Sequence, residues 1–106
     1  MTEPDRTDDY VVASEIAVAA ESGPVLEAAF AHRLREVENH DGFRRLEVWR
    51  DCRTPGRYLM VSWWRDAADY RSYMRSDAHR RSHARIPGAP HQPKGVAVNL
   101  FEVVAR

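Results

Sequence analysis

Residues 57–86 read RYLMVSWWRDAADYRSYMRSDAHRRSHARI, and this stretch decides the fold. Residues 57–64 carry apolar side chains at both odd and even positions, and successive side chains of a strand point to opposite faces. Such a strand needs cover on both sides. From Asp66 onward we expect one helix that combines a basic surface with two aromatic residues, a methionine and two histidines, namely Tyr70, Tyr73, Met74, His79 and His83.

The composition excludes several functional classes. A chain of 106 residues is expected to form one domain with a modest core. Sixteen basic residues balance sixteen acidic ones, so no overall field attracts nucleic acid or an anionic membrane. Cys52 is the only cysteine, which excludes an internal disulfide and a multi-cysteine zinc site. No apolar run approaches the roughly 20 residues of a membrane span. We therefore expect a soluble cytoplasmic protein.

The remaining elements follow from the order of patterns along the chain. Residues 1–9 are polar and without periodicity, so we expect a disordered tail before a single domain at 10–106. Alternating residues predict four strands, and helical spacing predicts a first helix that begins near Pro24 and ends in the turn 39–42. The strands are expected at 10–18, 43–51, 57–64 and 96–104, with the middle two forming a hairpin. The order β-α-β-β-α-β predicts an α+β, ferredoxin-like fold with both helices on one face of an antiparallel sheet.

This layout leaves the second face of the sheet uncovered. We expect Tyr58, Met60, Trp64 and Trp49 to place apolar side chains there. A second copy of the chain, packed sheet to sheet, would cover them and protect the edge strands. The two-sided apolarity therefore predicts a homodimeric barrel.

Two histidines on the second expected helix are the main candidates for chemistry. His79 and His83 are four residues apart, a spacing by which a helix supplies two metal ligands. A closed zinc or non-haem iron site also needs a third ligand, and no nearby acid has an obvious claim to that role. Haem needs one axial histidine, an apolar slot and cations for its propionates, which His83, Tyr73 and the arginines offer. The alternative is a solvated basic helix face, and His40 and His91 are likewise expected in solvated loops.

Four segments carry a resemblance to a known family: GPVLEAAFAHR at 23–33, VENHDGF at 37–43, YLMVSWW with DAADYRSYMRSDAHRRSH within 58–83, and FEVV at 101–104. Over residues 10–104 the chain resembles the antibiotic biosynthesis monooxygenase family of dimeric α+β barrels, in particular its haem-degrading branch. The resemblance implies haem as cofactor and site residues by position. His83 matches the axial histidine, Tyr73 a pocket tryptophan and Ser14 an asparagine of the first strand; Phe30 and Arg33 match pocket-lining positions, and Trp64 is a further candidate for cofactor contact.

These observations lead to one functional expectation and two alternatives. The first is a haem-binding, haem-degrading or haem-dependent monooxygenase with His83 on the iron, in which Ser14 and Arg33 orient oxygen and the propionates. The second is a cofactor-independent monooxygenase that oxidises a polycyclic phenol or anthrone in polyketide antibiotic biosynthesis, with Tyr73, Trp64 or a histidine assisting deprotonation. The third is a small-ligand-binding barrel without enzymatic activity.

Overall fold

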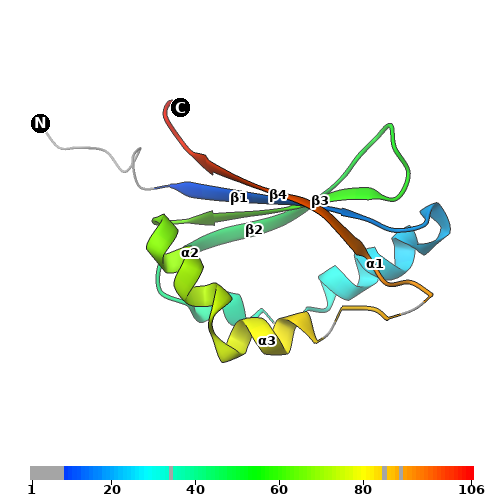
Figure 1. Cartoon of the computed structure of the whole chain (residues 1–106), viewed down its shortest axis with the longest axis horizontal. Helices are drawn as coiled ribbons and strands as arrows, with labels where there is room; N and C mark the ends of the chain where they lie inside the picture. Colours follow the sequence, from blue (N-terminus) through cyan, green and yellow to red (C-terminus); the bar gives the residue numbers. More distant parts are fainter. Residues whose placement is uncertain (1–8, 34, 85, 89) are drawn as a thin grey trace, which may run out of the picture.

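The computed structural model describes residues 9–33, 35–84, 86–88 and 90–106, and it has the expected ferredoxin-like order of elements. Four strands form a single antiparallel sheet in the order β2-β3-β1-β4, and the helices lie together on one side of it (Figure 1). The elements are β1 (Tyr10–Ala17), η2 (Ala20–Ser22), α1 (Gly23–Ala31), η3 (Glu36–Asn39), β2 (Phe43–Arg50), β3 (Arg57–Trp64), α2 (Ala67–Met74), α3 (Asp77–His83) and β4 (Lys94–Glu102).

Each of the two expected helices is interrupted. The first ends at Ala31, and the chain then passes through Arg35, whose φ of 62° is left-handed, into the 3₁₀ turn η3. Leu34, which falls within the expected first helix, lies outside the described residues. The second breaks after Met74, where Ser76 takes extended backbone angles and caps α3. The prediction of two continuous helices was therefore wrong, because local capping and backbone geometry override an apolar period that runs across both breaks.

The assignment of the two sheet faces also needs correction. Tyr58, Met60 and Trp64 were expected away from the helices, but Met60 and Trp64 line a cavity beneath them, and Tyr58 donates a 2.6 Å hydrogen bond to Glu27 of α1. Trp49 does lie on the open face, paired in register with Leu59. The alternation along β3 correctly predicts which side chains share a face of the strand. It does not indicate which face lies toward the helices, because both faces are apolar.

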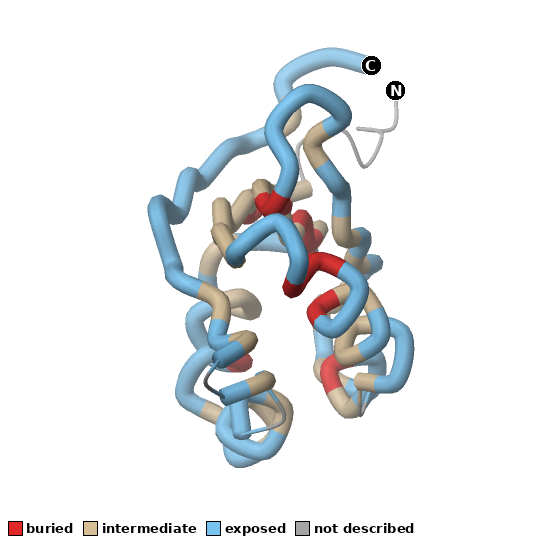
Figure 2. The backbone as a smooth tube through the Cα atoms, turned by 90° about the vertical axis from the view of Figure 1, so that its right-hand side faces the viewer, coloured by how far each residue is buried: buried red, intermediate tan, exposed pale blue. Residues whose placement is uncertain are grey.

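The core lies between the sheet and the helices, where Val12, Val37, Trp64 and Tyr73 form one buried cluster. Figure 2 shows the buried positions gathered toward the middle of the molecule. All nine residues of the edge strand β4 are exposed, in contrast. The helices thus cover the β1–β3 part of the sheet and leave β4 open.

The start of the described chain is held against the body of the protein. Asp9 forms a 2.6 Å ion pair with Arg44 and a second with Arg106, and its carbonyl accepts a hydrogen bond from the Val103 amide. Residues 1–8 of the predicted tail lie outside the described residues. Within the described part of the chain, no helix is long and apolar enough to cross a membrane.

Replacement of Gly56 should destabilise the hairpin between β2 and β3. Gly56 has a φ of +86°, and an added Cβ would clash with the carbonyl oxygen of Val18. We expect Gly56→Ala to lower the free energy of unfolding by about 1–3 kcal/mol, measured by urea denaturation. Gly95→Ala is the matched control, because open space surrounds its Cβ position and its stability should stay within about 0.5 kcal/mol of wild type. Equal losses in both variants would contradict this account.

Loss of the Ser76 cap should loosen α3. The Ser76 hydroxyl accepts a 3.1 Å hydrogen bond from the His79 amide and donates a 2.6 Å hydrogen bond to the Tyr73 carbonyl. We expect Ser76→Ala to cost about 1 kcal/mol of unfolding free energy and to speed amide hydrogen exchange in α3. Ser72→Ala, at an exposed position inside α2, should leave both measurements unchanged. A Ser76→Ala protein as stable as Ser72→Ala would show that the cap is unimportant.

Candidate functional site

A cavity of about 210 Å³ lies between the helix-facing side of the sheet and the helices. Its floor comes from β1 and β3 with Leu46 of β2, and its walls come from α1, α2, α3 and the segments that join them. Every residue that the sequence singled out as a site candidate lines it: Ser14, Phe30, Arg33, Trp64, Tyr73 and His83. The fold therefore brings together side chains that are up to 69 positions apart in the sequence (83 − 14 = 69).

Aromatic rings form the deep wall of the cavity. Trp64 is only 1% exposed, and its indole N–H donates a 2.8 Å hydrogen bond to the Ser62 hydroxyl. Its ring centroid lies 5.4 Å from that of Tyr73 and 5.3 Å from that of Phe43. These separations are within the range of favourable aromatic pairs. The wall is therefore preformed, and the indole N–H of Trp64 is satisfied within it.

His40 packs against the aromatic rings of this wall without lining the cavity itself, and the sequence did not predict this contact. Its ring lies edge-on to Tyr73, with centroids 5.4 Å apart, and 6.2 Å from Trp64. The expectation of a solvated turn residue was wrong, because the turn before β2 folds onto the end of β3. The position of His40 between Val37, which is buried, and Phe43, which is half-buried, was the available signal.

His91 is likewise held rather than solvated. A 2.8 Å hydrogen bond joins its Nδ1 to the hydroxyl of Ser22, which is buried at the start of α1. This contact ties the proline-rich loop before β4 to the first helix. Pro87 and Pro93 of the same loop line the cavity, so the loop contributes to its wall.

Arg33 brings a positive charge into the cavity wall. Its guanidinium lies 3.3 Å from Glu38, and its side chain is 20% exposed. Burial, with a smaller contribution from the neighbouring charge of Arg35, lowers the pKa of Arg33 from its ordinary value. Its Nε is buried and has no hydrogen-bond partner, which is true of no other side-chain nitrogen or oxygen among the described residues. A buried donor without a partner is costly, so this atom indicates where an acceptor could bind.

Two imidazoles of α3 face the cavity. His79 is half-buried and lies edge-on to Tyr73 with 5.3 Å between centroids, whereas His83 is exposed and 5.8 Å from His79. Burial, and next the charge of His83, lowers the pKa of His79, while a hydrogen bond to the Met74 carbonyl opposes the shift. No cluster of three or more His, Cys, Asp or Glu side chains suited to a metal occurs in the part of the chain that the structure describes.

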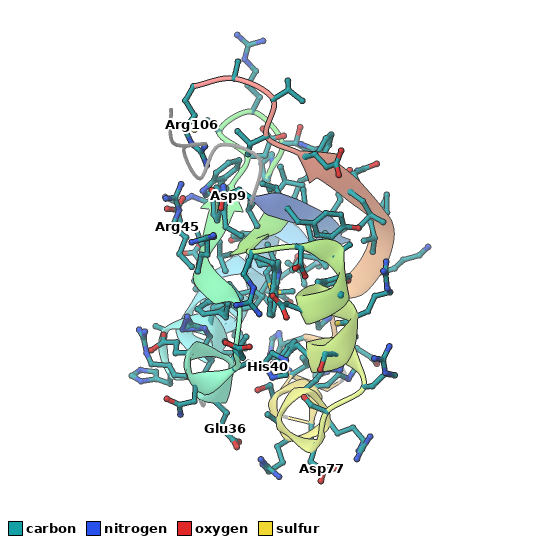
Figure 3. The ribbon with its side chains drawn as sticks, turned by 90° about the vertical axis from the view of Figure 1, so that its left-hand side faces the viewer. Asp9, Glu36, His40, Arg45, Asp77 and Arg106 are labelled. Carbon is teal, nitrogen blue, oxygen red and sulfur yellow. The ribbon has the colours of Figure 1, made fainter. Side chains whose placement is uncertain are left out.

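The helices form two arms on either side of the cavity: α1 with η3 is the first helical arm, and α2 with α3 is the second. A salt bridge joins these two helical arms. Arg81 of α3 donates a 2.9 Å hydrogen bond from Nε to Glu36 of η3. Figure 3 shows Glu36 and Asp77 on the side of the molecule away from the sheet, with His40 nearer the sheet. Arg81 is exposed and Glu36 is half-buried, so the pair contributes only modest stability by itself, although it links the arms.

Comparisons with known proteins show which family the chain resembles in sequence and fold. The family model described as antibiotic biosynthesis monooxygenase matches residues 9–85. A relative from Mycobacterium tuberculosis, described as heme oxygenase (mycobilin-producing), is 34% identical over 91 residues, which span 84% of this chain and 83% of the relative.

Two solved structures share the fold over most of the chain. The structure of the heme-degrader MhuD from Mycobacterium tuberculosis, with two hemes bound in its active site, aligns with a TM-score of 0.68 and 29% identity over 91% of this chain and 94% of that one. The crystal structure of SnoaB, a cofactor-independent oxygenase from Streptomyces nogalater, aligns with a TM-score of 0.69 over 93% and 94% of the two chains; at 18% identity it shows the fold alone. The sequence match and the ferredoxin-like architecture together show that the chain belongs to the antibiotic biosynthesis monooxygenase family.

Proposed function

We propose that this protein binds haem in the cavity and acts as a haem-degrading or haem-dependent monooxygenase. The 34% identical relative is a heme oxygenase, and the heme-degrader MhuD binds its hemes on the same fold. Those properties belong to the relatives. For this chain, the proposal is supported by the chemistry of the residues that line the cavity.

The unpartnered Nε of Arg33 is the observation that carries the proposal. An apolar cavity with one buried cationic donor suits a ligand that is mainly hydrophobic and bears an anionic acceptor. The carboxylate of a haem propionate has this character, and a charge-assisted hydrogen bond to a guanidinium is among the stronger polar contacts in proteins. Glu38, 3.3 Å from the terminal nitrogen of Arg33, holds the side chain in place.

The other lining residues have roles that follow from their positions. Phe30, Trp64 and Tyr73 supply apolar and aromatic walls that exclude water, and Trp64 is fixed by its bond to Ser62. Ser14 places a hydroxyl on the sheet floor, where it can donate a hydrogen bond to a bound oxygen molecule. An imidazole of α3 supplies the axial nitrogen, the role for which His83 was singled out in the sequence. Bound haem would itself supply the redox chemistry with O₂.

A haemin titration of the purified protein tests this function. We expect a Soret shift with wild-type protein, and an affinity about tenfold to hundredfold lower in Arg33→Met, because that variant loses a charge-assisted contact and keeps the apolar stem. Arg71→Met is the matched control, since Arg71 is exposed on α2 and does not line the cavity. The absence of a Soret shift in wild type, or equal affinities in the two variants, would contradict the proposal.

The cavity volume favours a second candidate function. At about 210 Å³ the cavity is smaller than the roughly 300–1,000 Å³ typical of ligand pockets, so a flat polycyclic phenol would require less opening than haem. In that function the substrate would be oxidised without a cofactor, and Tyr73, Trp64 or a histidine would assist its deprotonation. Oxygen uptake by metal-free protein with an anthrone would support this function, and inertness together with tight haemin binding would exclude it.

The open face of the sheet supports a homodimer, as the family resemblance implies. Trp49 and Phe101 are 46% and 53% exposed there, and Trp63 lies between them in the sheet under the guanidinium of Arg45, 3.9 Å from its ring. An apolar face of this kind is typical of an interface. A second copy, packed sheet to sheet, would remove both aromatic side chains from water.

The two sides of β4 offer a matched test of this dimer. Phe101 lies on the open face, whereas Val98, on the same strand, pairs in register with the cavity residue Ser14 and is 60% exposed. We expect Phe101→Glu to yield a monomer and Val98→Glu to remain dimeric in analytical ultracentrifugation, because only the first places a charge in the interface. A monomeric wild type, or dissociation by Val98→Glu alone, would rule out packing through the open face.

A further inference from the structure

Helix α3 forms part of the cavity wall, but it contributes no buried residue to the fold. It is seven residues long, and none of its side chains is buried. A break at Ser76, whose backbone is extended, separates it from α2. Three of its residues line the cavity, namely His79, Ser82 and His83. Because an element with little buried surface opens at low cost in free energy, α3 is the part of the wall best able to move.

The 3₁₀ turn η3 on the first helical arm is held by the core, in contrast. Val37 of this turn is 5% exposed and belongs to the buried cluster that also contains Trp64 and Tyr73. Glu36 directly precedes Val37, and its side chain is only half-buried. The carboxylate of Glu36 is therefore attached to a backbone that the core keeps in place.

One ion pair joins the weakly packed helix to the anchored turn. Arg81 of α3 approaches the Glu36 carboxylate with two nitrogens: Nε lies 2.9 Å from one oxygen, and the terminal nitrogen Nη2 lies 2.5 Å from the other. Such a two-point contact between guanidinium and carboxylate fixes direction as well as distance. Neither Glu36 nor Arg81 lines the cavity. The pair thus ties α3 to η3 from outside the wall, and its removal takes nothing from the surface that a ligand would touch.

The cavity is too small for a large ligand while α3 keeps this position. Its volume of about 210 Å³ is below the roughly 300–1,000 Å³ typical of ligand pockets. Haem, the ligand of the proposed function, requires the wall to open. Since the core holds η3, widening of the cavity by movement of α3 requires Arg81 to leave Glu36.

We propose that the ion pair between Arg81 and Glu36 is a latch that controls the entry of ligands into the cavity by holding α3 against η3. The proposal rests on the proposed haem-binding function, which sets the size of the ligand that has to enter. An exposed ion pair is weak enough to break and form again readily, and its loss changes an opening equilibrium by about twofold to fivefold. The latch therefore governs the rate of entry without contacting the ligand.

Stopped-flow measurement of haemin association tests the latch. We expect both Glu36→Gln and Arg81→Gln to raise the association rate constant by about twofold to fivefold, because either substitution removes the pair. The two variants change the net charge in opposite directions, so attraction of the anionic haemin cannot raise both rates. Asp41→Asn is the matched control, since its carboxylate pairs with Arg65 at 3.0 Å and neither residue lines the cavity. The rate in this control should stay near that of wild type.

Reversal of the pair and a measurement without ligand complete the test. The double variant Glu36→Arg with Arg81→Glu should form the pair in the opposite sense and return the association rate to near the wild-type value. Amide hydrogen exchange in α3 should be faster in both single variants of the latch and near wild type in the double variant and in Asp41→Asn. Circular dichroism establishes that each variant is folded.

Two results would overturn the latch and leave the proposed function intact. One is an association rate that follows charge alone, rising in Glu36→Gln and falling in Arg81→Gln. The other is hydrogen exchange in α3 that is the same in wild type and both single variants. A wild-type protein without a Soret shift would instead remove the proposed function, and the hydrogen-exchange comparison would still decide whether the pair holds α3 in place.

Discussion

The burial of Trp64 at the end of β3 is the interaction on which the rest of the structure depends. Its indole is 1% exposed and contacts four rings. They belong to His40 in the turn before β2, to Phe43 of β2, and to Tyr70 and Tyr73 of α2. Burial of one large apolar side chain contributes about 1.5–3 kcal/mol before entropy is counted, and each favourable aromatic pair adds about 0.5–1.5 kcal/mol. One side chain thereby joins the sheet to the second helical arm. Tyr73 packs on Trp64 and in turn contacts the Ser76 cap through its carbonyl and the His79 ring through its side chain.

The candidate site combines this aromatic wall with an arginine that lowers the stability of the free protein. Arg33 keeps a buried donor without a partner, and a desolvated guanidinium lowers stability unless an acceptor compensates. Folded proteins tolerate few such groups, and those that persist call for an explanation. An anionic ligand in the cavity would supply the missing acceptor. The same residue would then cost stability in the free protein and contribute affinity in the complex.

The two faces of the sheet carry different sets of side chains. The helix-facing side provides the cavity floor through Ser14, Met60 and Trp64, whereas the open side carries Trp49, Trp63 and Phe101. Two helical arms cover only the β1–β3 region, and this leaves β4 exposed along its whole length. A sheet with apolar residues on both faces and cover on one leaves apolar side chains exposed to water on the other. The proposed pairing of two copies therefore follows from the same two-sided strand that specifies the fold.

The sequence by itself determined the order of elements, the strand boundaries to within a few residues and six of the side chains that line the cavity. Those features follow from alternation, helical spacing and family motifs, all of which are local along the chain. The tertiary structure alone decided which side of β3 faces the helices, because a strand that is apolar on both sides carries no such signal. It also decided where the helices break, that His40 and His91 are packed, and that His79 is anchored while His83 is exposed. The packing of His40 on Trp64 and of His91 on Ser22 depends on contacts between residues distant in sequence, which a local pattern does not contain. The helix breaks depend on capping and backbone geometry, which an apolar period does not report.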